Sequence, residues 1–147
     1  MRKFYPLLLA ALAGCSSNDK PATVAAPVKA VFDVPALLPQ TIDQIKATLG
    51  KTEGNDDEPT KQQITAGVKE WEKSFKRDTT TLLVTYDPKT RKVIDFFVST
   101  NHGKTADVAP LTQLANVDPA KPNGIDAVPV PMLANKQLFT GVKLVRK

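Results

Sequence analysis

The sequence is poor in the residues from which most metal centres and catalytic sites are built. Its 147 residues include a single cysteine and a single histidine. This excludes a disulfide framework, a zinc site made of several Cys and His ligands, and a Cys–His catalytic pair. We therefore expect no metal site and no cofactor. A composition of 41% hydrophobic and 24% charged residues is typical of one compact domain.

A strong excess of one charge is also missing. Twenty Lys and Arg residues against fifteen Asp and Glu residues give the chain a net charge of +5. A nucleic-acid partner requires basic residues clustered on one face together with aromatic residues that stack on bases. The small basic excess does not predict such a surface, and we expect no nucleic-acid partner.

The apolar run at the N-terminus is too short to cross a membrane. It covers residues 5–12 and follows the basic residues Arg2 and Lys3. Spanning about 30 Å of hydrocarbon takes about 20 residues. The run therefore predicts a signal peptide over residues 1–14 rather than a membrane-spanning helix.

The predicted signal peptide ends at the only cysteine. Leu12-Ala13-Gly14-Cys15 resembles the lipobox of bacterial lipoproteins, in which small residues admit the processing enzyme and the thiol accepts the lipid. The resemblance implies that Cys15 becomes the first mature residue, carries fatty acyl chains such as palmitate, and holds the protein on a membrane. Ser16 stands where Asp is the usual inner-membrane retention signal, which implies the periplasmic face of the outer membrane in a Gram-negative source. The alternative is that Cys15 is an unmodified thiol.

Composition divides the rest of the chain into two parts. Residues 15–30 are mostly small and polar, contain proline and lack hydrophobic periodicity, so they predict a flexible tether that begins at the lipidated Cys15. From residue 31 onward, apolar clusters alternate with turn signals. We expect a single folded domain over residues 31–147.

Helix signals occur at three places in this domain. Thr41 and Gln44 form a capping box ahead of apolar residues at helical spacing, and Gly50 is suited to the left-handed conformation that ends a helix. Thr60 and Gln63 repeat the same box. The signals predict short helices over residues 42–49, near residues 60–67 and within residues 107–117.

Strand signals dominate the middle of the chain. Apolar residues alternate over residues 82–86 and 93–98, and Asp87-Pro88 supplies the first two positions of a type I turn, so we predict a β-hairpin. Residues 71–77 fit a strand or a helix, and we favour the strand because a hairpin follows. These three strands carry five aromatic residues, and we expect them to supply most of the core.

The C-terminal part predicts two further strands. Two prolines within residues 127–133 cannot donate hydrogen bonds to a neighbouring strand, so this segment is expected at a sheet edge. Apolar residues over 142–145 predict a last strand. The fold class is α+β, with short helices packed on one face of a small antiparallel sheet.

The order of these elements resembles a known group of lipoproteins. A helix ending in Leu49-Gly50, a polar loop, Trp71 and two paired strands is similar to the small outer-membrane lipoproteins of the SmpA/OmlA type. The resemblance covers the chain up to Ser99 and implies two helices on a short sheet and a role in barrel assembly. Uncharacterised lipoproteins of similar layout also match this order.

Two groups of polar residues are candidates for chemistry. The first is an acidic loop, residues 51–58, whose carboxylates lack the spacing of a calcium-binding loop, so we interpret it as a solvated loop. Its acidic residues are Glu53, Asp56, Asp57 and Glu58. The second is His102, which would need Asp107 as its orienting group and a nucleophile motif that the sequence lacks. We interpret His102 as an exposed turn residue and expect no catalytic residue.

Basic and aromatic residues near the predicted sheet are candidates for binding. A cluster of six cations at the hairpin ends fits either contact with anionic lipid or, as we favour, edge and turn residues that keep strands from aggregating. Its members are Lys73, Lys76, Arg77, Lys89, Arg91 and Lys92. Trp71 fits either a core position or, if exposed, a site for a protein partner.

These observations favour a lipid-anchored protein of the cell envelope that is not an enzyme. We expect an interaction, assembly or structural module that contacts the membrane through Cys15 and binds an envelope protein. The alternative is a small periplasmic ligand-binding module, which requires an apolar pocket of a few hundred Å³ between sheet and helices. A hydrolase built around His102 is a third, less favoured hypothesis.

Overall fold

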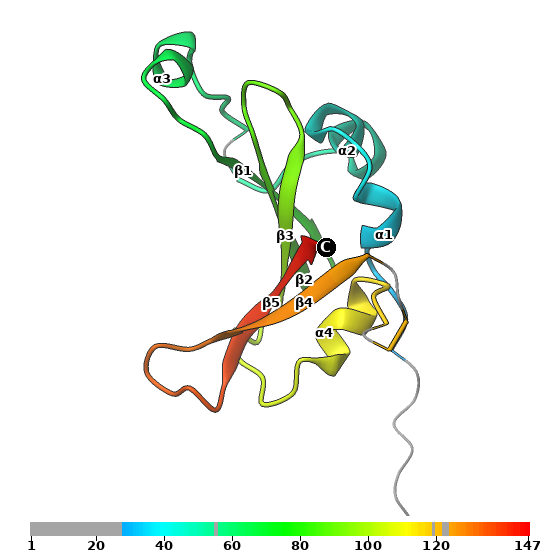
Figure 1. Ribbon diagram of the computed structural model, residues 1–147. Helices are drawn as coiled ribbons and strands as arrows, with labels where there is room; N and C mark the ends of the chain where they lie inside the picture. The colour runs from blue at the N-terminus through cyan, green and yellow to red at the C-terminus, as the bar shows by residue number, and fades with distance from the viewer. Residues whose placement is uncertain (1–27, 55, 119, 122–123) are drawn as a thin grey trace, which may run out of the picture.

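A five-stranded antiparallel sheet organises the protein (Figure 1). The computed structural model describes residues 28–54, 56–118, 120–121 and 124–147. Neighbouring strands in the sheet follow the order β1 (Trp71–Arg77), β2 (Thr80–Tyr86), β3 (Val93–Thr100), β5 (Phe139–Arg146) and β4 (Ile125–Pro131). Together with a few short helices this sheet confirms the predicted α+β class.

Three of the four helices in the described residues lie on the same side of the sheet. These are α1 (Val34–Leu37), α2 (Ile42–Leu49) and α4 (Ala109–Leu114). The fourth, α3 (Lys61–Thr65), lies away from the others beyond the end of β1 and has no buried residue. One face of the sheet therefore carries the helices, and the opposite face does not.

The local signals read from the sequence place α2 correctly. The Thr41 hydroxyl accepts the Gln44 N–H, and the Gln44 side chain accepts the Thr41 N–H at 2.9 Å, which completes the capping box. Gly50 ends the helix with φ of +85°, a conformation that favours glycine. The resulting short amphipathic helix buries Ile42 and Ile45 against the sheet.

The β2–β3 hairpin also matches its prediction. Leu83 stands opposite Phe97 in the ladder, and the pairing shifts by one residue next to Thr85. In the turn, the Asp87 carboxylate accepts the N–H groups of Lys89 and Thr90. Asp87 is therefore the residue that closes the turn.

The core is shared more evenly along the chain than predicted. Strands β1 to β3 contribute six of the seventeen buried apolar residues found in the described part of the chain. The expectation that they supply most of the core is wrong, because the N-terminal segment, the helices and β5 fill the same layer. Phe32, for example, is 1% exposed and belongs to this core.

The C-terminal hairpin occupies the edge of the sheet. β4 pairs only with β5, as expected for a strand in which Pro129 and Pro131 cannot donate hydrogen bonds. β5 lies between β3 and β4 and buries Val142 and Leu144. No helix in the described residues has the length and apolar character needed to cross a membrane.

Candidate interaction surface

A fully buried lysine lies at the centre of the most highly charged part of the molecule. Lys73 lies on the helix-covered side of β1, and none of its side chain is exposed. Its ammonium donates to the Asp57 carbonyl oxygen at 2.6 Å and lies 3.1 Å from an Asp56 carboxylate oxygen and 3.5 Å from a Glu58 carboxylate oxygen. A buried ammonium requires such partners, because burial without them is costly.

Further charges extend this arrangement to α2 and to the β2–β3 turn. Lys46 lies 3.0 Å from Asp56, and Arg91 lies 2.7 Å from Glu58 and donates to both oxygens of Asp43. We call these residues the ion-pair cluster: Asp43, Lys46, Asp56, Glu58, Lys73 and Arg91. Three carboxylates and three cations balance one another, and they join α2, the loop, β1 and the turn.

The cluster changes the acidity of its members. Hydrogen bonds from Lys46 and Lys73 lower the pKa of Asp56 to about 2. Partial burial acts to raise the pKa of Glu58, but hydrogen bonds from Arg91 and Tyr86 outweigh it and the pKa is lowered. Burial, together with the hydrogen bond of 2.8 Å to Glu58, raises the pKa of Tyr86. The carboxylates are thus held in their charged form.

The cluster corrects two interpretations of the sequence. The acidic loop is not a purely solvated loop, because Asp56 and Glu58 pair with cations and Glu53 pairs with Lys76 at 3.1 Å. Nor are the six basic residues simply edge and turn cations, since Lys73 is buried and Arg91 is bound by two carboxylates. Within the described residues, no group of three or more His, Cys, Asp or Glu side chains is placed to hold a metal ion.

Trp71 lies beside the cluster at the start of β1. Its ring is partly buried against the core, and its indole N–H donates to the Asp57 carbonyl oxygen at 3.0 Å. The exposed part of the ring borders a shallow hollow with Glu70 and Glu72. Trp71 is therefore neither fully buried in the core nor fully exposed at the surface.

His102 is not assembled into a catalytic group. It is exposed in the loop after β3. The Asp107 carboxylate, its expected orienting partner, instead accepts the Ala109 N–H at 2.9 Å at the start of α4. The geometry gives His102 no contact that would make it a general base.

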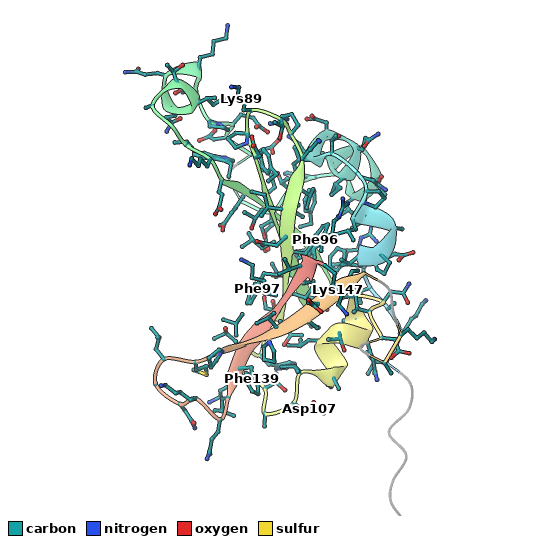
Figure 2. All side chains as sticks on the ribbon, in the orientation of Figure 1. Lys89, Phe96, Phe97, Asp107, Phe139 and Lys147 are labelled. Atoms are coloured by element: carbon teal, nitrogen blue, oxygen red, sulfur yellow. The ribbon has the colours of Figure 1, made fainter. Side chains whose placement is uncertain are left out.

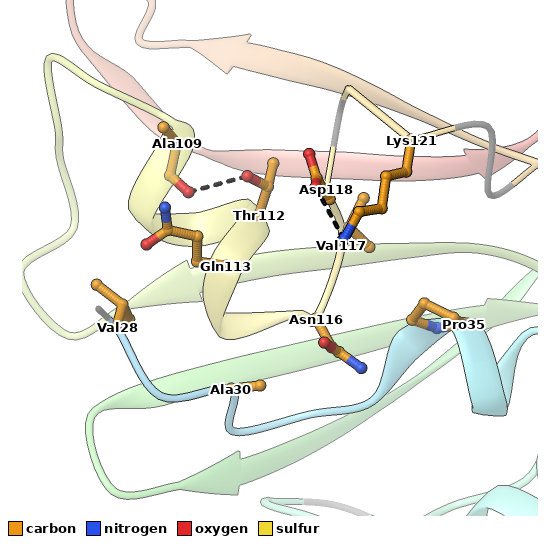
Figure 3. A pocket seen from close by; sticks show the side chains of 10 residues that line it. All are labelled: Val28, Ala30, Pro35, Ala109, Thr112, Gln113, Asn116, Val117, Asp118 and Lys121. Atoms are coloured by element: carbon orange, nitrogen blue, oxygen red, sulfur yellow. Dashed lines mark hydrogen bonds and ion pairs between the residues drawn. The ribbon is translucent and has the colours of Figure 1, made fainter.

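The hollow beside α4 differs from the pocket expected of a ligand-binding module. It is a surface groove of about 520 Å³ between the N-terminal segment near Val28 and α4, not a cavity between sheet and helices (Figure 3). The Thr112 hydroxyl already donates to the Ala109 carbonyl oxygen, and Lys121 lies 3.4 Å from Asp118. The space between sheet and helices is filled by the core.

The uncovered face of the sheet carries a row with three apolar residues, a serine and a lysine. Successive side chains alternate between the two faces of a strand, so residues that flank buried core residues point away from the helices. One row of such residues crosses all five strands, each paired with the next: Ser74, Leu83, Phe97, Lys143 and Val128. Leu83 and Phe97 are partly exposed, and Val128 is 48% exposed. We call this row and its neighbours on the same side the open face.

A second row on the open face is polar. Thr85 stands opposite Asp95, and Asp95 stands opposite Val145, which also pairs with Asp126. The Lys143 ammonium reaches diagonally to the Asp95 carboxylate at 2.8 Å, and this bond raises the pKa of Lys143. Thr85 and Asp95 are 7% and 5% exposed, so these two residues present little polar surface to a partner, and Val128, the most exposed large apolar residue of the open face, belongs to the first row.

The Phe97 ring on this face packs against a glycine. A Cβ atom at Gly141 would collide with the Phe97 ring and with the Val98 carbonyl oxygen. Gly141 on β5 thus leaves the space in which the ring lies across the neighbouring strand. Figure 2 shows Phe96 and Phe97 at the centre of the sheet, and only Phe96 is fully buried.

Comparisons with known proteins add no relative. No protein-family model matches the chain, and no curated protein or solved structure is similar to it. Cys15 lies outside the described residues. The lipobox and the likeness to SmpA/OmlA-type lipoproteins therefore remain predictions from the sequence.

Proposed function

We propose that the protein is a lipid-anchored component of the cell envelope whose open face binds another protein. The observation that carries the proposal is the set of three apolar residues, Leu83, Phe97 and Val128, on the side of the sheet that no described helix covers. Apolar side chains that stay partly exposed on an uncovered sheet face are suited to contact with another protein. The role is one of binding rather than catalysis.

The membrane part of the proposal rests on the sequence. Leu12-Ala13-Gly14-Cys15 supplies the lipidation signal, and twelve residues separate Cys15 from Val28, where the described chain begins. Twelve residues reach at most about 40 Å when fully extended. The open face would thus be displayed within a short distance of the bilayer and meet partners in or near it.

Separate measurements test the two parts. Mass spectrometry of the native protein is expected to show acyl chains on Cys15, and Cys15→Ala is expected to leave the membrane fraction while Ser16→Ala remains there. A Cys15→Ala chain that still fractionates with the membrane would contradict the anchor.

Binding is tested by crosslinking in intact cells. A photoreactive residue at Val128 is expected to give a defined crosslinked product that a residue at Gln62, exposed on α3, does not give. Leu83→Lys, on the same row, should abolish the product at Val128, because a charged side chain cannot be buried without a partner. Equal products from both positions, or a product unaffected by Leu83→Lys, would contradict an interface on the open face.

A further inference from the structure

The tip of the β4–β5 hairpin presents an apolar side chain directly to solvent. Leu133 is 104% exposed, more than any other large apolar residue in the described part of the chain. It lies near the end of a run of eight residues, 127–134, that has no charged or hydrogen-bonding side chain. In Figure 1 the hairpin projects from the body of the protein, so no other element shelters its tip.

The tip is ordered by its own hydrogen bonds. The Met132 N–H donates to the Leu138 carbonyl oxygen at 2.8 Å, and the Leu138 N–H donates to the Asn135 carbonyl oxygen at 3.0 Å. The Asn135 side chain accepts the Gln137 N–H at 3.0 Å. Leu133 therefore projects into solvent from a turn that hydrogen bonds keep ordered.

Apart from Asp126 near the start of β4, the charged residues of this hairpin are basic. Residues 127–147 contain four Lys and Arg residues and no Asp or Glu. Three of them have partners within the fold, since Lys143 pairs with Asp95, Lys147 pairs with Asp126, and Arg146 donates to the Leu38 carbonyl oxygen. Lys136 is exposed beside the tip, and the described residues place no carboxylate in an ion pair with it. An apolar tip next to a free cation suits the surface of an anionic membrane.

Backbone hydrogen bonds connect the hairpin to the loop that leads to α4, beside which Val28 lies. Phe139 of β5 exchanges two backbone hydrogen bonds with Thr105, of 2.7 and 2.9 Å. The loop from Thr105 leads to Ala109, which borders the same groove as Val28 (Figure 3). Val28, the first described residue of the chain, thus lies beside α4, whereas α3 lies at the opposite end of the molecule.

We propose that the hairpin tip, residues 132–137, inserts Leu133 into the surface of an anionic bilayer and so fixes the orientation of the domain on the membrane. The proposal deepens the proposed function and rests on its membrane location. A tether of twelve residues keeps the tip at high effective concentration near the lipid. A single apolar side chain with one cation is then sufficient for contact. The open face would be held at a defined angle to the bilayer.

The experiment places a fluorescent reporter at the tip of the full-length native protein. Leu133→Trp and, as the matched control, Gln62→Trp are incorporated into vesicles of phosphatidylethanolamine and phosphatidylglycerol whose acyl chains are brominated. Wild-type protein gives the background from Trp71. Insertion to the depth typical of interfacial segments predicts that about half of the added emission is quenched for Leu133→Trp and almost none for Gln62→Trp.

Two results would overturn the proposal. The first is equal quenching of the two variants. The second is protection of Leu133→Trp from a water-soluble quencher only when envelope proteins are added, because this would assign the tip to a protein partner. Mass spectrometry of Cys15 in the same samples distinguishes this failure from failure of the anchor. A chain without lipid contradicts the proposed anchor, yet quenching of its Leu133→Trp variant would still support the hairpin contact.

Discussion

The two ends of the sheet use their charged residues in opposite ways. At the end near α2 and the β2–β3 turn, three carboxylates and three cations bind one another, and Lys73 is wholly buried among them. At the hairpin tip, Leu133 and Lys136 face solvent, whereas the other three cations of residues 127–147 have partners within the fold. Charged residues therefore hold separate segments together at one end, whereas at the tip of the hairpin Lys136 remains available for binding.

The strongest test of this contrast compares two lysines on the same strand. Lys73 and Lys76 both pair with carboxylates, but Lys73 is buried and Lys76 is exposed. Lys73→Ala is expected to lower the free energy of unfolding by about 3 kcal/mol, because it leaves a cavity and removes the cation that balances Asp56 and Glu58. Lys76→Ala should cost less than about 1 kcal/mol, as exposed pairs do. Urea unfolding measures both.

A further variant sharpens the interpretation of Lys73. Lys73→Met keeps most of the volume and removes the charge, so a cost close to that of Lys73→Ala would show that charge rather than packing matters. Equal losses for Lys73→Ala and Lys76→Ala would contradict the view that the ion-pair cluster is a structural centre.

A smaller effect is expected from acid. The pKa values of Asp43, Asp56 and Glu58 are lowered in the fold, that of Asp56 to about 2. A lowered pKa contributes stability above the ordinary value of about 4, and this contribution is lost as the pH falls toward the folded value. Acid should therefore destabilise the region of the ion-pair cluster between about pH 4 and pH 2. The hairpin tip, which has no carboxylate of its own, should be affected only at lower pH.

Two backbone amides report on this difference. The Glu53 N–H donates to the Ser74 carbonyl oxygen at 2.7 Å beside the ion-pair cluster, and the Met132 N–H donates to Leu138 at 2.8 Å in the hairpin. Hydrogen exchange, corrected for intrinsic rates, should show that the protection of Glu53 falls before that of Met132 when the pH is lowered. Simultaneous loss at both amides would indicate global unfolding rather than a local effect of the ion-pair cluster.

Much of the fold followed from signals confined to a few neighbouring residues. Thr41 with Gln44 fixed the start of α2, Asp87 with Pro88 marked the β2–β3 turn, and Pro129 with Pro131 identified an edge strand. Each of these residues acts through its own backbone or through a partner within four positions. Such effects depend little on the rest of the chain.

The ion-pair cluster could not be derived in this way, because its partners come from separate segments. Asp43 and Arg91, for instance, are 48 residues apart. One signal was present: Lys73 alternates with Trp71 and Phe75, which places its side chain on the apolar side of a strand. A lysine at such a position requires carboxylates, and the acidic loop of residues 51–58 supplies four of them upstream of the strand. The open face depended on where the helices pack, which no single segment determines.

The smallest effect on stability is expected at the hairpin tip. Because Leu133 has no packing partner to lose, Leu133→Asp should change the free energy of unfolding by less than about 0.5 kcal/mol. Leu144→Ala in the same hairpin removes a buried side chain and should cost about 3 kcal/mol. Urea unfolding of the two variants distinguishes a surface residue from a core residue within one hairpin. A large loss for Leu133→Asp would mean that the tip is packed in solution, and it would then be unable to reach a membrane without unfolding.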